Sequence, residues 1–178
     1  YPCSFMFVAS MNPCPCGYYG DPTHRCVCTP GQIQRYMNKI SGPLLDRIDI
    51  QCEISPVPFQ DISKAAPGEP SAKIRERVIK AREVQAERFK DYKGIHCNAQ
   101  MTERMIHQFA EPDEQGIELL RMAMEKLSLS ARAYNRILKV ARTIADLAES
   151  EQIKPDHIAE AVGYRTLDRG DWAERGHL

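Results

Sequence analysis

Several functional classes are excluded by what this sequence lacks. It contains no Gly-x-x-x-x-Gly-Lys-Ser/Thr segment and no apolar strand ending in Asp-Glu, so a phosphate-binding loop and its magnesium-binding acid are both absent. No apolar run approaches the length of a membrane helix and no signal peptide opens the chain, so we expect no membrane partner. Net charge is also absent, because 24 Lys and Arg balance 24 Asp and Glu. Overall charge therefore does not indicate a nucleic-acid partner.

Cysteine, in contrast, is plentiful and unevenly distributed. An odd count of seven argues against a closed disulfide framework, so we expect a protein of a reducing compartment, the cytoplasm. Four of the seven form two Cys-x-Cys units in one loop: Cys14, Cys16, Cys26 and Cys28. Four thiolates brought together by a turn could hold a structural zinc ion, with His24 as a spare ligand. The alternative is a set of free thiols in a loop shaped by its prolines and glycines. No His-Glu-x-x-His helix is present to support a catalytic zinc.

Two short segments near the beginning of the chain have strand patterns. Residues 4–10 are almost entirely apolar, which predicts a strand buried on both faces of a parallel sheet. Such a strand needs neighbours, so we expect the rest of the sheet upstream of Tyr1. Residues 48–54 alternate apolar and polar side chains, which predicts a second strand. Between them, a loop rich in proline and glycine leads to a helix that begins near Thr29-Pro30.

The second half of the sequence has a helical pattern. Residues 55–70 are rich in proline and predict a linker. Apolar residues then recur at helical spacing through a series of short helices, the last one opened by Pro155. We predict a mainly α fold: a remnant of a P-loop NTPase α/β core over 1–54, with two strands, a Cys-rich loop and a helix, then a linker over 55–70. A helical lid bundle over 71–170 and a flexible tail over 171–178 would follow.

Three polar residues lie where they could contact a bound phosphate. Asn12 follows the predicted first strand, where ligands of α/β sheets bind, although an asparagine before proline is also a common turn residue. Arg47 lies in an apolar hook over residues 42–50, which would leave Asp46 and Arg47 projecting, unless Arg47 simply pairs with Asp46 or Asp49. Arg132 lies at the start of a predicted helix, where donors favour a phosphate; the alternative is a solvated basic helix face.

The order of these features resembles that of AAA+ ATPases, and more closely their magnesium-chelatase-like branch, which includes bacterial competence-associated proteins. The stretches that carry the resemblance are Ala9–Gly17, Pro43–Ile50, Ser130–Arg132 and Arg142–Leu147. The resemblance implies that Asn12 is the sensor-1 residue, which places the attacking water. It implies that Arg47 is an arginine finger reaching into a neighbouring subunit. It also implies that Arg132 is the sensor-2 arginine of the lid.

The same resemblance implies cofactors and partners. Relatives of this kind work as ATP-dependent rings, usually hexamers, that use ATP and Mg²⁺, and competence-associated relatives suggest DNA as a partner. Because the phosphate-binding loop is absent here, we expect this chain alone neither to bind ATP tightly nor to hydrolyse it. The complete parent protein would be the ATP hydrolase.

Three other interpretations remain open. Residues 71–93 carry eight Lys or Arg against four Asp or Glu, so the chain could be a zinc-stapled nucleic-acid-binding module, or this helix could simply have a charged solvent face. The parent could instead be an ATPase subunit that serves metal insertion into a tetrapyrrole, although the Cys-rich loop argues against this. A structural adaptor is a third alternative, which the buried strand pattern disfavours.

Overall fold

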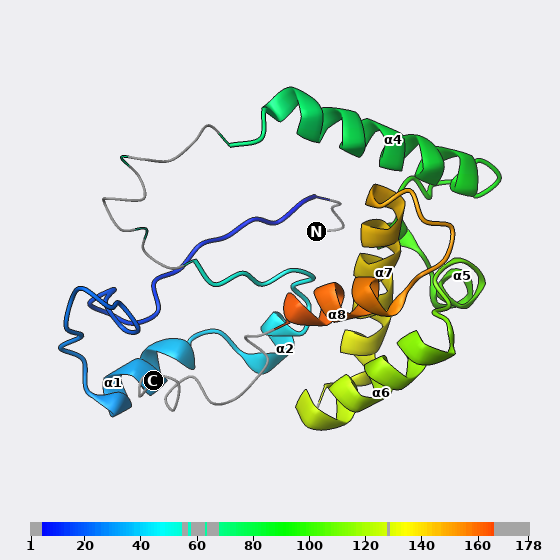
Figure 1. Ribbon diagram of the computed structural model, residues 1–178. Helices are drawn as coiled ribbons and strands as arrows, with labels where there is room; N and C mark the ends of the chain where they lie inside the picture. Colours follow the sequence, from blue (N-terminus) through cyan, green and yellow to red (C-terminus); the bar gives the residue numbers. More distant parts are fainter. Residues whose placement is uncertain (1–4, 55–56, 58–62, 64–67, 128, 166–178) are drawn as a thin grey trace. The chain divides into compact units, whose positions relative to one another are not determined.

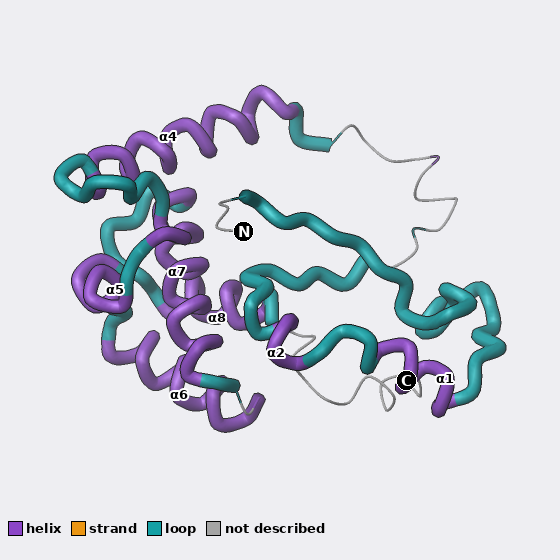
Figure 2. Tube along the Cα trace, turned by 180° about the vertical axis from the view of Figure 1, so that it is seen from behind, coloured by secondary structure: helices purple, strands orange, loops and turns teal. Residues whose placement is uncertain are grey.

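The structure, a computed structural model, describes residues 5–54, 57, 63, 68–127 and 129–165. It divides into two compact units, the first ending at Ser41 and the second beginning at Gly42. Helices and loops make up the described chain, and Figure 2 draws no strand in it, which confirms the prediction of a mainly α fold. Most of the predicted linker and the whole predicted tail lie outside the described residues. The predicted domain boundaries therefore stay a prediction.

The described part of the first unit contains one helix, α1 (Pro30–Met37), and it begins where the sequence predicts. Thr29 forms a reciprocal capping box with Gln32: Thr29 Oγ1 accepts from the amide of Gln32, and Gln32 Oε1 accepts from the amide of Thr29. These bonds satisfy amides that the first turn of a helix leaves unpaired. Ile33 is the buried residue of this helix.

The prediction of a buried strand at the start of the chain is wrong for the described residues. Residues 5–10 have no strand hydrogen bonds, and Phe5, Met6 and Val8 are 71%, 88% and 80% exposed. A strand exists only when a neighbour completes its ladder. No described segment supplies one, so the apolar pattern is present without the burial that it normally indicates.

The second predicted strand is also wrong, for a different reason. Residues 48–54 form an irregular segment in which Ile50 and Ile54 are exposed and Gln51, on the opposite parity, is 5% exposed. The amide of Gln51 donates to Tyr164 O at 2.8 Å, and its side-chain amide donates to Leu45 O at 3.2 Å. The segment is therefore held by contacts with a helix end and a turn, and not by a strand ladder.

The second unit is a bundle of helices arranged around one central helix. Its elements are α2 (Gly42–Leu45), α4 (Ser71–Phe89), the short 3₁₀ helix η1 (Asn98–Gln100), α5 (Glu103–Phe109), α6 (Glu114–Leu127), α7 (Ala131–Leu147) and α8 (Pro155–Gly163). Helix α7 contacts α4, η1, α5 and α8, while α8 also packs on α6 (Figure 1). None of the described helices is both long and apolar enough to cross a membrane.

The core of the bundle forms where α7 and α8 meet their neighbours. The buried apolar residues are Phe89, Met101, Met105, Ile106, Ala110, Leu120, Ile137, Leu138, Ala141, Ala145, Ile153, Ile158 and Ala161. Tyr92 and Phe109 pack against this core and meet Phe89 and each other edge to face, with ring centroids 5.8 to 6.4 Å apart. Alanines on α7 let neighbouring helices approach closely, which explains how short helices bury a continuous core.

A buried carboxylate lies inside this bundle. The side chain of Asp146, near the end of α7, is fully buried and forms a bidentate pair with Arg88 of α4 at 2.5 and 2.7 Å. It also accepts from Asn98 Nδ2 at 2.8 Å and from Arg142 Nε at 3.1 Å. Arg142 in turn donates to the carbonyls of Ser150 and Glu151, which follow α7. One carboxylate therefore connects α4 and η1 with α7 and, through Arg142, with the loop that leaves α7.

Removing the charge of Asp146 should destabilise the second unit strongly. An Asp146→Asn substitution leaves two guanidinium groups without their shared counter-charge, which costs about 3–5 kcal/mol when a buried pair is broken. Urea denaturation followed by circular dichroism should show this loss. Glu118→Gln, which removes an exposed carboxylate paired with Arg121 on α6, should change stability by less than about 0.5 kcal/mol. Equal effects of the two substitutions would contradict this role for Asp146.

The same carboxylate predicts a specific acid sensitivity. Burial raises the pKa of Asp146, but hydrogen bonds from Arg88 and Asn98 and the charge of Arg142 outweigh it and hold the pKa below its usual value. Its contribution to stability is therefore complete above the unfolded pKa of about 3.9, and is lost as pH falls through the lower folded pKa. The difference in unfolding free energy between the wild type and Asp146→Asn should be constant from pH 7 to about 5 and shrink below about 4. A difference that grows on acidification would contradict this assignment.

Candidate functional site

Two tight turns shape the cysteine loop of the first unit. In the first, the amide of Gly17 donates to Cys14 O at 3.0 Å, and Gly17 has φ = +85°, a conformation that favours glycine. In the second, Asp21 Oδ1 accepts from the amides of Thr23 and His24 at 2.7 and 3.0 Å. Hydrogen bonds from Thr23 lower the pKa of Asp21 to about 2. Asp21 therefore stays ionised and keeps the turn closed at neutral pH.

These turns bring the four predicted cysteines together. Their sulfur atoms all lie within 4.8 Å of one another. The Sγ atoms of Cys14, Cys16 and Cys26 are 3.4 to 3.7 Å apart. A tetrahedral site with Zn–S bonds of about 2.3 Å places its sulfurs ~3.8 Å apart, so the spacing fits a four-sulfur metal site. The predicted spare ligand His24 is not part of this group; its ring stacks on Tyr18 instead, with centroids 4.9 Å apart.

The thiols differ in how easily they ionise. Backbone hydrogen bonds from Tyr18 and Val27 lower the pKa of Cys16 to about 6. For Cys26, a backbone hydrogen bond from Cys28 lowers the pKa, but burial and the neighbouring thiols together raise it to about 12. Cys16 therefore forms the thiolate, which is the form that binds a metal, more readily than Cys26 does.

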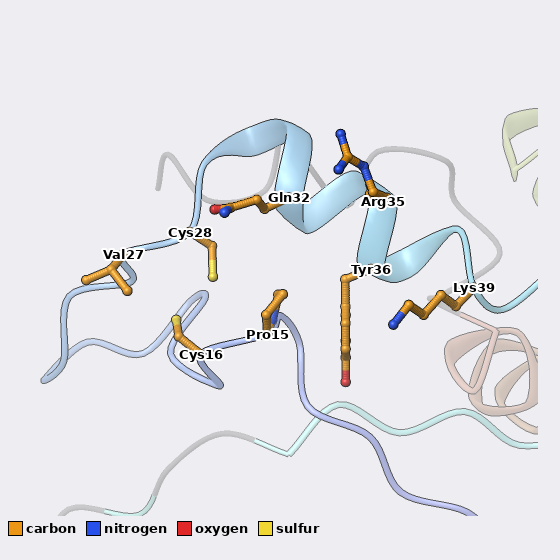
Figure 3. Close-up of a pocket in the computed structure, with 8 residues that line it drawn as sticks. All are labelled: Pro15, Cys16, Val27, Cys28, Gln32, Arg35, Tyr36 and Lys39. Atoms are coloured by element: carbon orange, nitrogen blue, oxygen red, sulfur yellow. The ribbon is translucent and has the colours of Figure 1, made fainter.

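A surface pocket of about 450 Å³ lies between the cysteine loop and α1. Figure 3 shows Cys16 and Cys28 on one side, with their sulfur atoms pointing toward each other, and Tyr36 and Lys39 on the other. The ammonium group of Lys39 lies 5.7 Å from the centre of the Tyr36 ring. Arg35 adds a second positive charge to the lining.

In the second unit, the segment around Arg47 forms the predicted hook. The single turn α2 carries Leu44 and Leu45, and Arg47 follows it with an exposed side chain. Arg47 Nη1 donates to Pro43 O at 2.5 Å and pairs with neither Asp46 nor Asp49. The prediction that Asp46 would project with Arg47 is wrong, because Asp46 accepts a hydrogen bond from Ser130 Oγ at 3.3 Å. The hook thus presents one guanidinium group with a single backbone acceptor.

Arg132 lies in the first turn of α7. Ser130 caps this helix by accepting from the amide of Ala133 at 3.2 Å. The side chain of Arg132 is exposed and has no hydrogen bond or ion pair with any residue that the structure describes. The other basic residues of this face are occupied: Arg136 pairs with Asp49, and Lys139 donates to Ala99 O at 3.0 Å. Among these three, Arg132 is therefore the cation that is available to a ligand.

Asn12 belongs to the first unit, whereas Arg47 and Arg132 belong to the second. Its side chain is exposed and lies beside Gly17, where a β-carbon added to the glycine would be 3.7 Å from Asn12 Nδ2. The structure therefore groups Arg47 with Arg132 through the Asp46–Ser130 hydrogen bond and places Asn12 next to the cysteine turn. Its sensor role stays a prediction.

One buried residue near the hook was missed by reasoning from the sequence. Arg165, two residues after the end of α8, is 0% exposed, and its Nη1 donates to Ile48 O at 2.9 Å. An arginine close to a helix end normally indicates a solvated or capping side chain. Neither spacing nor composition distinguishes it from the other basic residues, so only the fold reveals that it contacts the hook.

Two family models match this chain, one in each half. Residues 1–62 match the family model described as magnesium chelatase, subunit ChlI, and residues 68–165 match the model described as magnesium chelatase, subunit ChlI C-terminal. The competence protein ComM of Haemophilus influenzae is 42% identical over 170 residues, which cover 95% of this chain and 32% of that protein.

Two further relatives show similar coverage. The uncharacterized protein YifB of Escherichia coli is 44% identical over 170 residues, covering 95% of this chain and 32% of its own length. The uncharacterized protein Mb2921c of Mycobacterium bovis is 36% identical over 165 residues, covering 93% and 32%. This chain therefore spans about a third of the length of the curated relatives that it matches.

Proposed function

Because this chain belongs to the magnesium chelatase subunit ChlI family, a family related to the AAA+ ATPases, we propose that it supplies three residues to a ring-shaped ATPase. Asn12 would orient the attacking water, Arg47 would act as an arginine finger in a neighbouring subunit's site, and Arg132 would sense nucleotide from the lid. The ring would be a hexamer in the complete protein. Arg47 carries this proposal, because the fold holds the residues around it and leaves its side chain exposed.

The surroundings of Arg47 suit a transition-state contact. A finger must reach out of its own subunit with its guanidinium group unsatisfied by local carboxylates. Arg47 meets this requirement within the described part of the chain: its flanking residues are hydrogen bonded, while its own Nη1 donates to Pro43 O and to no carboxylate. A planar guanidinium group on a fixed backbone can donate hydrogen bonds to the oxygens of a transferring phosphoryl group, over which negative charge spreads.

ATP and Mg²⁺ are the cofactors that the family implies. The residues of this chain fit a part of that site only, because the sequence has no phosphate-binding loop to hold the nucleotide. Arg132 fits a phosphate contact, since it is a cation without a described partner in the first turn of α7. We therefore propose that ATP and Mg²⁺ are bound by another part of the complete protein, and that this chain alone is inactive.

Replacing Arg47 should abolish hydrolysis without abolishing ATP binding. In the complete protein, Arg47→Ala should lower kcat by about 10³-fold or more, which is the range measured for arginine fingers. Arg104→Ala removes another exposed arginine of the same unit, on α5, and should leave kcat unchanged. Steady-state ATPase assays and a separate nucleotide-binding assay measure both effects.

Mixed rings test whether Arg47 acts in a neighbour. Subunits with Arg47→Ala should regain activity when mixed with subunits that lack the phosphate-loop lysine, because each supplies what the other lacks. An Arg47→Ala protein that hydrolyses ATP normally would show that Arg47 is only a surface side chain, and mixtures that stay inactive would show that Arg47 does not act in a neighbouring subunit.

We also propose that the cysteine loop holds a structural zinc ion through Cys14, Cys16, Cys26 and Cys28. The sulfur spacing of the cluster supports this proposal. Bound there, the ion would cross-link two turns and leave no open position for catalysis. The first unit has reason to need a cross-link, because Cys14 and Ile33 are the buried apolar residues among its described residues.

Zinc analysis should find one ion per chain. A Cys26→Ser substitution should remove it and accelerate tryptic cleavage at Arg25, because the loop loses its cross-link. Cys97→Ser, outside the cluster, should retain the zinc and the resistance to trypsin. Purified protein with no zinc, and with all four loop thiols reacting freely with a thiol reagent, would refute this proposal.

Ion pairs weaken one of the alternative functions, the nucleic-acid-binding module, and do not bear on the others. Of the eight basic residues over 71–93, four form ion pairs in the structure, namely Arg77, Lys80, Arg88 and Lys90. This pairing favours the charged solvent face over a nucleic-acid stripe on α4. DNA remains a candidate partner of the complete ring, suggested by the relative named for competence. Service to a tetrapyrrole chelatase remains the other hypothesis, suggested by the family's name.

A further inference from the structure

The residues on both sides of Arg47 are held by a single buried side chain. Arg165 is fully buried, and its Nη1 donates to Ile48 O at 2.9 Å. Its Nη2 lies 3.9 Å from Asp46 Oδ1, the carboxylate that precedes Arg47. The contact with Ile48 O is a directional hydrogen bond of the planar guanidinium group, and the contact with Asp46 is a longer ion pair. Arg165 therefore restrains the backbone immediately after Arg47 and the side chain immediately before it.

The first turn of α7 provides a second attachment for the hook. Ser130 Oγ donates to Asp46 Oδ2 at 3.3 Å while it accepts from the amide of Ala133. One turn further along α7, Arg136 forms an ion pair with Asp49. The hook is thus bonded to the same helix end that carries Arg132.

The third attachment lies at the end of α8. The amide of Gln51 donates to Tyr164 O at 2.8 Å, next to Arg165 in the sequence. Gln51 also holds the hook together internally, because its side chain donates to Leu45 O. Contacts from α7 and from the residues after α8 therefore surround a segment from which the Arg47 side chain projects.

We propose that Arg165 is a positioning residue for the arginine finger: it anchors the Asp46-Arg47-Ile48 backbone on the lid helices, so that the finger moves with the lid. The proposal rests on the finger role of Arg47 given above. Its physical basis is that a long side chain can reach a neighbour's site productively only from a fixed backbone. A misplacement of about 1 Å can cost about 10²-fold in rate. Because Arg132 and Arg47 are then carried by one unit, a change of lid angle changes where the finger points.

Mixed rings with Arg165→Gln distinguish a role of Arg165 in positioning Arg47 from a role in folding alone. One population carries Arg47→Ala and provides the active sites; the other lacks the phosphate-loop lysine and provides the fingers. Arg165→Gln in the finger-providing subunits should lower the restored kcat by about 10²-fold, with an unchanged KM for ATP. The same substitution in the subunits that already carry Arg47→Ala should have little effect, because their own finger is absent. Arg165→Lys, which keeps the charge but not the planar fork, should restore only part of the rate.

A second variant guards against misfolding, since Arg165 is fully buried. Asp46→Ala, at a partly exposed position, removes the carboxylate that Arg165 and Ser130 share, and should lower the rate only in the finger-providing subunits. Glu118→Ala on α6 is the matched control and should be silent in either population. An Asp46→Ala that is silent, or losses of equal size in both populations, would overturn the positioning role. Unmodified mixtures without activity would instead show that the finger role itself is wrong.

Discussion

The second unit depends on one buried carboxylate. Asp146 is fully removed from water, and its two oxygens accept from Arg88, Arg142 and Asn98. An isolated charge in such a place would cost several kcal/mol, and only this complete set of donors makes the burial tolerable. The donors come from α4, η1 and α7 itself, so the carboxylate specifies how three elements meet. Helix α8 packs on the same α7, and the hook is bonded to the other end of α7 through Ser130 and Arg136.

The Asp146 network explains how a bundle of short helices can hold the backbone around Arg47 in a defined position. The network holds α4 and the C-terminal part of α7, while Ser130 caps the other end of α7 and holds Asp46. Between these ends, alanines and isoleucines of α7 form the core. The helix is therefore fixed at both ends and along one face, which gives the hook a rigid support about 25 Å from the buried carboxylate, at ~1.5 Å per residue. Arg47 can then be mobile in its side chain and still fixed in its backbone.

Local signals in the sequence predicted the elements that depend on local bonds. Thr29-Pro30, Ser130 and Pro155 begin helices in the structure because a cap or a proline acts within one turn. The Cys-x-Cys spacing predicted the cluster for a similar reason, since two short turns bring the sulfurs together. The strands failed because a ladder needs a partner that the pattern itself does not contain. Gln51 and Arg165 could not be predicted, because each is polar by composition and buried only by contacts far along the chain.

The two units differ in the interactions that can stabilise them. The bundle buries a continuous apolar core and one compensated carboxylate. The cysteine unit has only two buried apolar residues among its described residues, too few to offset the conformational entropy of an ordered loop. Its turns are set by Gly17 and Asp21, but hydrogen bonds of exposed turns contribute little net stability. A cross-link between the two Cys-x-Cys units would supply what the missing core does not, and it would hold Asn12, beside the first turn, in a defined place.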